Sequence, residues 1–92
     1  MAKVRKHVFI YGKVQGVGYR YSAFNMAVNL GIKGWVRNKY DGSVEAMLEG
    51  DEVVLNQMIE WCKKGPFMSH VENVEIYNYN YEEEFSDFSI RG

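Results

Sequence analysis

The chain has 92 residues, of which 47% are hydrophobic, 15% aromatic and 25% charged. This size fits one domain, and the balance excludes a disordered segment because so many apolar residues can bury a core. The single cysteine, Cys62, excludes an intramolecular disulfide and a cysteine-based metal cluster. No stretch is apolar for long enough to serve as a signal peptide or to span a bilayer. We therefore expect one domain over residues 1–92, located in the cytoplasm and independent of membranes.

Charge is divided unevenly between the two halves of the chain. Residues 1–40 carry eight lysines and arginines and no acidic residue, whereas residues 41–92 carry twelve acidic residues and three basic ones. The excess of positive charge in the first half favours an anion-binding site there. Alternatively, the two halves attract each other and form ordinary pairs at the surface, and the charge pattern leaves both interpretations open.

The first third of the chain predicts a strand, a glycine-rich loop and a helix. β-Branched and aromatic residues at 7–11 predict the strand, and three glycines break its pattern over residues 12–18. From Arg20 onward apolar residues recur at steps of three and four, which predicts a helix that ends at Gly31. The apolar stripe of this helix consists of Ala23, Phe24, Ala27, Val28 and Leu30.

A hairpin follows this helix. Two strands, at 32–38 and 43–49, flank an Asp-Gly turn, which is a strong hairpin signal. Apolar and polar residues alternate along the second strand, so we expect one buried face and one solvated face. The side chains expected on the solvated face are those of Ser43, Glu45 and Glu49.

The rest of the chain predicts a helix and two strands. Asp51 is the expected N-cap of the helix, and Gly65-Pro66 ends it. A strand at 71–81, a solvated acidic bend at 82–84 and a short strand at 85–90 complete the chain. The order is βαββαβ plus a short C-terminal strand. It predicts an α+β, ferredoxin-like split β-α-β sandwich, with two helices on one face of an antiparallel sheet.

The glycine-rich loop has the features of a phosphate-binding site. Gly16 and Gly18 can adopt positive φ, which lets successive backbone N–H groups converge on one anion. The helix that follows adds its unpaired amides, and Arg20 adds a planar cation that can bind two phosphate oxygens. The spacing is not that of a nucleotide P-loop or a dinucleotide fingerprint. The simpler alternative is a glycine-rich connection with Arg20 at the surface.

Asn38 ends the second predicted strand. Strand interiors disfavour asparagine, and the residue stands directly before the turn at 39–42. Taken by itself, Asn38 is most simply interpreted as a turn residue.

Two segments resemble a known family. Residues 12–20, Gly-Lys-Val-Gln-Gly-Val-Gly-Tyr-Arg, are similar to the first signature of the acylphosphatase family, Gly-x-Val-Gln-Gly-Val-x-Phe/Tyr-Arg, at every specified position. Residues 34–44, Gly-Trp-Val-Arg-Asn-x-x-x-Gly-x-Val, and the chain on to Gly50 match its second signature. The signatures have the expected order and separation, and the resemblance covers almost all of the chain.

The resemblance implies an activity and a set of site residues. Arg20 would bind the phosphate, Asn38 would orient an attacking water, and the substrate would be an acyl phosphate. The backbone amides that would complete the phosphate cradle belong to Gln15, Gly16, Val17, Gly18 and Tyr19. Inorganic phosphate or sulfate would bind as a product-like ligand, and the family needs neither metal nor cofactor. The signatures contain no His, Asp, Glu or Cys, which fits because a departing carboxylate, with a conjugate-acid pKa of roughly 4, needs no general acid.

Other residues and functions receive less support. His7 and His70 lack partners at metal or triad spacing, and Cys62 falls on an apolar helix stripe. Tyrosines 77, 79 and 81 have strand spacing and are expected on one sheet face. Two alternative functions are an acylphosphatase-like binding domain of a larger protein and a single-stranded RNA-binding module, the latter suggested by residues 33–40. We expect a monomer that binds no nucleic acid.

Overall fold

The computed structural model describes residues 2–92, and its elements follow the predicted order. This part of the chain forms β1 (Lys3–Lys13), α1 (Tyr19–Leu30), β2 (Lys33–Asn38), β3 (Val44–Asp51), α2 (Glu52–Lys64), β4 (His70–Tyr79) and β5 (Phe88–Arg91). Gly31 caps α1 in the left-handed conformation. The Asp51 carboxylate accepts a hydrogen bond from the Val53 amide at the start of α2. Both predicted helix caps are therefore confirmed.

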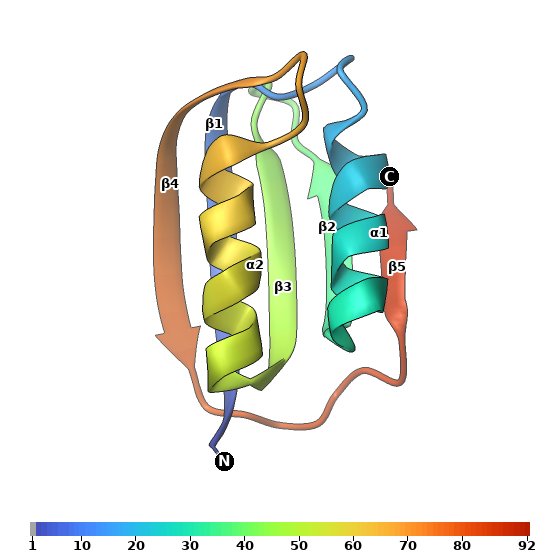
Figure 1. Ribbon diagram of the computed structural model, residues 1–92, viewed down its shortest axis with the longest axis vertical. Helices are drawn as coiled ribbons and strands as arrows, with labels where there is room; N and C mark the ends of the chain where they lie inside the picture. Colours follow the sequence, from blue (N-terminus) through green and yellow to red (C-terminus); the bar gives the residue numbers. More distant parts are fainter. Residues whose placement is uncertain (1) are drawn as a thin grey trace.

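The strands form one sheet in the order β4-β1-β3-β2-β5, and both helices cover the same face of it (Figure 1). β1 pairs with β3 and β4, and β2 pairs with β3, all in antiparallel orientation. The split β-α-β architecture is thus confirmed, but β5 runs parallel to β2, so the sheet is mixed rather than purely antiparallel. The cause is visible in Figure 1: after β4 the chain crosses one end of the sheet to its far edge and then runs beside β2 in the same direction.

The hydrophobic core lies between the sheet and the two helices. α1 buries small side chains, Ala23 and Ala27, and these allow the helix to approach the sheet closely. Val28 was predicted on the same stripe but is 51% exposed, because the buried arc of this helix is narrow. α2 buries four apolar residues, which are Leu55, Met58, Ile59 and Cys62. No helix in the described part of the chain is long and apolar enough to cross a membrane.

The prediction that the outer face of β3 is solvated was wrong. Ser43, Glu45 and Glu49 were expected in solvent, yet they are only 2%, 6% and 1% exposed. β3 is the central strand, so long side chains of the neighbouring β1 and β2 cover its outer face. Glu45 accepts a hydrogen bond from Arg37 Nε at 2.6 Å, and His7 Nε2 lies 2.5 Å from its other oxygen. Although burial opposes ionisation, these partners lower the pKa of the Glu45 carboxyl.

Glu49 is buried by the acidic bend that was expected to be solvated. The backbone amides of Glu82 and Glu84 donate to its two oxygens at 3.1 and 3.0 Å. Arg5 Nη1 pairs with Glu49 at 3.2 Å, and its Nη2 pairs with Glu84 at 2.7 Å. Burial opposes ionisation of Glu49, but these hydrogen bonds outweigh it and lower its pKa. The bend therefore folds over Glu49, because the carboxylate satisfies backbone amides that lack a strand partner.

Candidate active site

The loop between β1 and α1 forms the floor of the candidate site. Its two inner glycines, Gly16 and Gly18, have φ of 74° and 79°, in the left-handed region predicted from the sequence. Gly18 is also the N-cap of α1 and offers no capping side chain. Within residues 2–92, no backbone amide of residues 15–18 donates a hydrogen bond to another residue. Together with the first turn of α1, the loop therefore presents free donors and a positive helix end to an anion.

Tyr19 anchors the loop to the second helix. Its side chain is buried, its hydroxyl donates to the Cys62 carbonyl at 2.7 Å, and its ring lies 5.2 Å from that of Trp61. Burial raises the pKa of the Tyr19 hydroxyl, which therefore stays protonated as the donor. The sequence predicted a role only for the amide of Tyr19. The structure shows that its side chain fixes the start of α1, and thereby the direction of the next residue.

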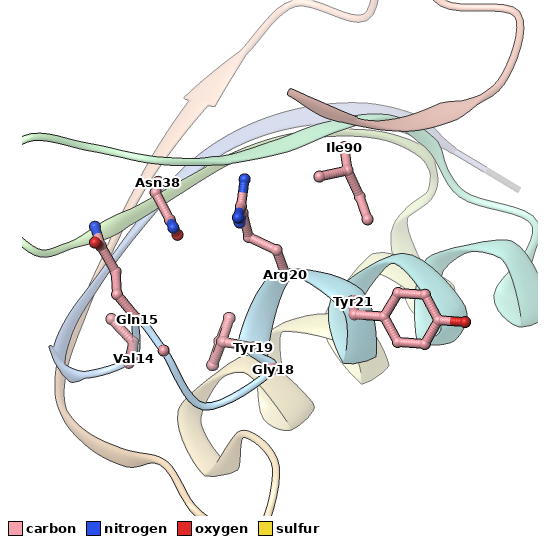
Figure 2. Close-up of a pocket in the computed structure, with 9 residues that line it drawn as sticks. Val14, Gln15, Gly18, Tyr19, Arg20, Tyr21, Asn38 and Ile90 are labelled. Carbon is pink, nitrogen blue, oxygen red and sulfur yellow. The ribbon is translucent and has the colours of Figure 1, made fainter. Parts of the chain in front are cut away.

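Arg20 extends from the first turn of α1 towards the end of β2 (Figure 2). Its Nη1 donates to the Arg91 carbonyl of β5 at 3.2 Å, and no carboxylate of the described residues pairs with it. The other arginines of the basic half, Arg5 and Arg37, are paired with glutamates of the acidic half. Both interpretations of the charge asymmetry therefore apply, and Arg20 is the arginine of that half whose positive charge remains available to an anion.

Asn38 is the last residue of β2 and faces Arg20 across the cavity (Figure 2). Its Oδ1 atom is buried and has no hydrogen-bond partner among residues 2–92. The turn that follows is closed by other groups: the Lys39 amide donates to the Ser43 carbonyl, and Asp41 accepts from Ser43. The interpretation of Asn38 as a turn residue is therefore wrong. A buried acceptor without a partner is rare, and this one belongs to a residue that lines the cavity.

The side chain of Gln15 joins the loop to the hairpin. Its Nε2 donates to the carbonyls of Lys39 and Ser43, at 2.7 and 2.8 Å. These carbonyls flank the turn that begins directly after Asn38. The sequence predicted only the backbone amide of Gln15 as a functional group, and no local pattern indicated the tether.

These groups line one cavity of about 310 Å³ (Figure 2). The predicted residues brought together there are Gln15, Gly16, Gly18, Tyr19, Arg20 and Asn38. Val17 is not among the lining residues, and its side chain packs against the core. The sequence missed three lining residues, Val14, Tyr21 and Ile90. No sequence pattern placed Ile90 at the cavity, because only the pairing of β5 with β2 brings the end of the chain beside Arg20.

A second cavity, of about 530 Å³, adjoins the first. Gln15 and Asn38 line both cavities, and the remaining lining residues of the second are Arg37, Lys39, Tyr40 and Gly92. Gln15 of the loop and Asn38 of β2 therefore lie between the two spaces.

The remaining candidates lie elsewhere. His7 pairs with Glu45 on the sheet face opposite the helices, where its ring also stacks near Phe9 and Tyr79. His70 begins β4 at the edge of the sheet and does not line the cavity. Cys62 is core filling, as predicted, and burial raises the pKa of its thiol to about 12.

The predicted tyrosine face is only partly formed. Tyr77 and Tyr79 belong to β4 and pack on the face of the sheet opposite the helices, beside Phe9 and His7. Tyr81 lies beyond the end of β4 and therefore does not continue the strand alternation.

Fold and site together define a class of protein: an α+β sandwich in which a glycine loop, a helix N-terminus and an arginine line one cavity beside an unpaired carboxamide, an arrangement suited to an anion. A family model for acylphosphatase matches residues 6–90. An acylphosphatase of Pyrobaculum islandicum is 50% identical over 91 residues, which are 98% of this chain and 96% of the relative. The chain belongs to the acylphosphatase family, whose members are hydrolases acting on acyl phosphates.

Solved structures agree with this assignment. The crystal structure of acylphosphatase from Bacillus subtilis has a TM-score of 0.93 and 34% identity, and the match covers 97% of this chain and 99% of that one. The crystal structure of full-length HypF in its phosphate- and nucleotide-bound form has a TM-score of 0.85 and 28% identity. That match covers 99% of this chain but only 12% of HypF, so the same fold also occurs as a small part of a much longer protein.

Proposed function

We propose that this chain hydrolyses the carboxyl–phosphate bond of acyl phosphates by direct attack of water, without a metal ion or a covalent intermediate. One observation carries the proposal: Asn38, whose buried Oδ1 has no partner within residues 2–92, lines the same cavity as Arg20 and the loop with its unpaired amides. An anion site beside a water-orienting group is the minimum that hydrolysis of a reactive phosphate ester or anhydride requires.

The phosphoryl group binds to the loop in this proposal. Backbone amides of residues 15–19 and the N-terminus of α1 supply donors that are fixed before the substrate arrives, because the loop glycines and Tyr19 hold the backbone in place. Arg20 supplies a full positive charge and two N–H groups in one plane. The Arg91 carbonyl holds one of its nitrogens and so orients the guanidinium.

The attacking water binds to Asn38. Its carboxamide accepts a hydrogen bond from the water and leaves a lone pair of the water oxygen free to attack phosphorus. A new P–O bond then forms to the water oxygen, the bridging P–O bond breaks, and its electrons leave with the carboxylate. One water proton passes to an oxygen of the substrate's own phosphate, so that the products are a carboxylate and inorganic phosphate. Holding the water in line contributes mainly through orientation.

The protein need not supply an acid, a base or a nucleophile. A departing carboxylate has a conjugate-acid pKa of roughly 4 and leaves without a proton at neutral pH. The cavity lining includes no carboxylate, imidazole or thiol among the described residues. The hydroxyl of Tyr19 faces Cys62, and the Cys62 thiol is buried in the core, so neither group can attack the phosphorus.

Hydrolysis of acetyl phosphate or benzoyl phosphate in excess EDTA tests the proposal. We expect turnover in EDTA equal to that without it, and competitive inhibition by inorganic phosphate. Solvent containing H₂¹⁸O should place the label in phosphate rather than in the carboxylate. Loss of turnover in EDTA would contradict the metal-free reaction, and label in the carboxylate would contradict direct attack at phosphorus.

The likeness to HypF supports a second candidate, in which the chain serves as a phosphate-handling domain of a larger protein. The same assay separates the two functions, because such a domain would bind phosphate without turning over free acyl phosphates.

A monomeric state and the lack of nucleic-acid binding remain predictions. The second is tested by a gel shift with single-stranded RNA at low and high salt, because phosphate contacts weaken steeply with salt.

A further inference from the structure

We infer that the side chain of Gln15 is a positioning residue, which holds the phosphate-binding loop and Asn38 at a fixed separation. This inference rests on the proposed function and adds to it a group that contacts neither the phosphate nor the water. The relevant contacts are the two hydrogen bonds from Gln15 Nε2 to the carbonyls of Lys39 and Ser43.

The tether uses the full donor capacity of one amide group. The NH₂ group of glutamine has two hydrogens, and each is directed at a different carbonyl. With N–O distances of 2.7 and 2.8 Å, both bonds are short for neutral groups. Their acceptors flank the turn, one directly after β2 and one directly before β3, so the bonds attach the loop to both sides of the turn.

The turn does not need Gln15 for its own stability. The Lys39 amide donates to Ser43, the Gly42 amide donates to Lys39, and Asp41 accepts from both the amide and the hydroxyl of Ser43. The hydrogen bonds to Asp41 also lower the pKa of its carboxyl, so these contacts persist at neutral pH. The hairpin is therefore a preformed surface, and the role of Gln15 is to attach the loop to it.

Nothing else in the described chain ties these two parts together by hydrogen bonds. Across residues 2–92, the two bonds from Gln15 are the only ones that join residues 14–18 to the hairpin of β2 and β3. The loop is otherwise held at its two ends, by β1, which pairs with β3 and β4, and by Tyr19 at the start of α1. In Figure 2 the side chains of Gln15 and Asn38 lie next to each other at the edge of the cavity.

The tether joins two parts of the site: the phosphate-binding groups on one side and the water-binding group on the other. The loop amides and Arg20 belong to the loop and α1, whereas Asn38 belongs to β2. If the tether is lost, the phosphate-binding groups keep their mutual geometry, but their distance from Asn38 is no longer fixed. A displacement of about 1 Å in such a site can cost about 10²-fold in rate. Loss of Gln15 should therefore lower kcat much more than it weakens phosphate binding.

The test compares Gln15→Met and Gln15→Glu with the unchanged chain. Both variants keep the length of the side chain and remove both donors. We expect kcat on acetyl phosphate to fall about 10- to 100-fold in each, while the inhibition constant of inorganic phosphate changes less than about threefold for Gln15→Met. Gln57→Met, an exposed glutamine of α2, is the matched control and should leave both constants unchanged. Circular dichroism and thermal unfolding check that each variant is folded.

A double-mutant cycle with Asn38→Ala separates positioning from a general structural role. If Gln15 acts through Asn38, then Gln15→Met should lower the residual kcat of Asn38→Ala less than about threefold, because the group it positions is already absent. The inference would be overturned by equal losses in both backgrounds, or by a loss of phosphate affinity as large as the loss of kcat. Failure of the unchanged chain to hydrolyse acetyl phosphate would refute the proposed function itself.

Discussion

Two regions of this molecule contain polar groups that are out of contact with bulk water. In one region these groups have hydrogen-bond partners, and in the other they do not. On the sheet face opposite the helices, Glu45 and Glu49 are buried and every carboxylate oxygen has a partner. At the end of the sheet where β1 meets α1, Asn38 Oδ1 is buried without a partner, and Arg20 lacks a carboxylate within the described chain.

The difference separates structural polar groups from functional ones. A buried polar group without a partner costs about 1–3 kcal/mol, so its presence needs a compensating reason, such as a ligand that supplies the missing contact. The paired glutamates should therefore contribute to stability and not to turnover. Asn38 and Arg20 should contribute to turnover and not to stability. Three substitutions test this contrast, from the largest expected effect to the smallest.

Arg20→Ala should have the largest effect. Loss of the charge that stabilises the phosphoryl group should lower kcat/KM by about 10³-fold, and it should also weaken inhibition by inorganic phosphate. The free energy of unfolding should change little, because Arg20 contributes one hydrogen bond to Arg91. Arg5→Met is the control from the other region. It removes the guanidinium that pairs with Glu49 and Glu84, so it should destabilise the fold and leave kcat unchanged. Equal effects of the two variants on activity would contradict the contrast.

Asn38→Ala should lower kcat by about 10²-fold while inorganic phosphate still binds with nearly unchanged affinity. The reason is that the water loses its acceptor but the phosphate loses no donor. Thermal unfolding should show no loss of stability, since the substitution removes an unpaired buried acceptor. A fully active Asn38→Ala variant would disprove the water-orienting role.

Glu49→Gln should have the smallest effect on activity and a measurable one on stability. The folded-state pKa of Glu49 is lowered below the usual 4.5, so its ionised form stabilises the fold above about pH 4.5. That contribution is lost as the pH falls through the folded-state pKa. We expect the variant to lose about 2 kcal/mol at pH 7 and less at pH 3, with kcat unchanged. Urea unfolding at pH 7 and pH 3 measures the two losses of stability. Equal losses would show that the charge of Glu49 does not contribute to stability.

The sequence predicted most of the site because its signals are local. Gly16, Gly18 and Arg20 lie within five residues, and the change from strand to helix around them is readable from composition. Asn38 was harder, because its position before a turn has an ordinary explanation. The resemblance to a family, rather than its own surroundings, identified it as a candidate site residue.

The errors came from residues whose surroundings are not local. Alternation along β3 was interpreted as one solvated face, but an alternating pattern cannot show that a distant segment, residues 82–84, returns to cover it. Likewise, nothing in the last residues indicated that β5 pairs with β2 in parallel and places Ile90 and the Arg91 carbonyl at the cavity.

By itself, then, the sequence determined the order of elements, the helix caps, the glycine loop and the residue types available to bind phosphate, because each depends on neighbours within a few positions. Tertiary structure alone decided which arginine stays unpaired, which asparagine oxygen is buried without a partner and how Gln15 joins the loop to the hairpin. The contacts that decide them include Gln15 with Lys39, 24 residues apart, and Arg20 with Arg91, 71 residues apart, and such groups meet only when the sheet is assembled.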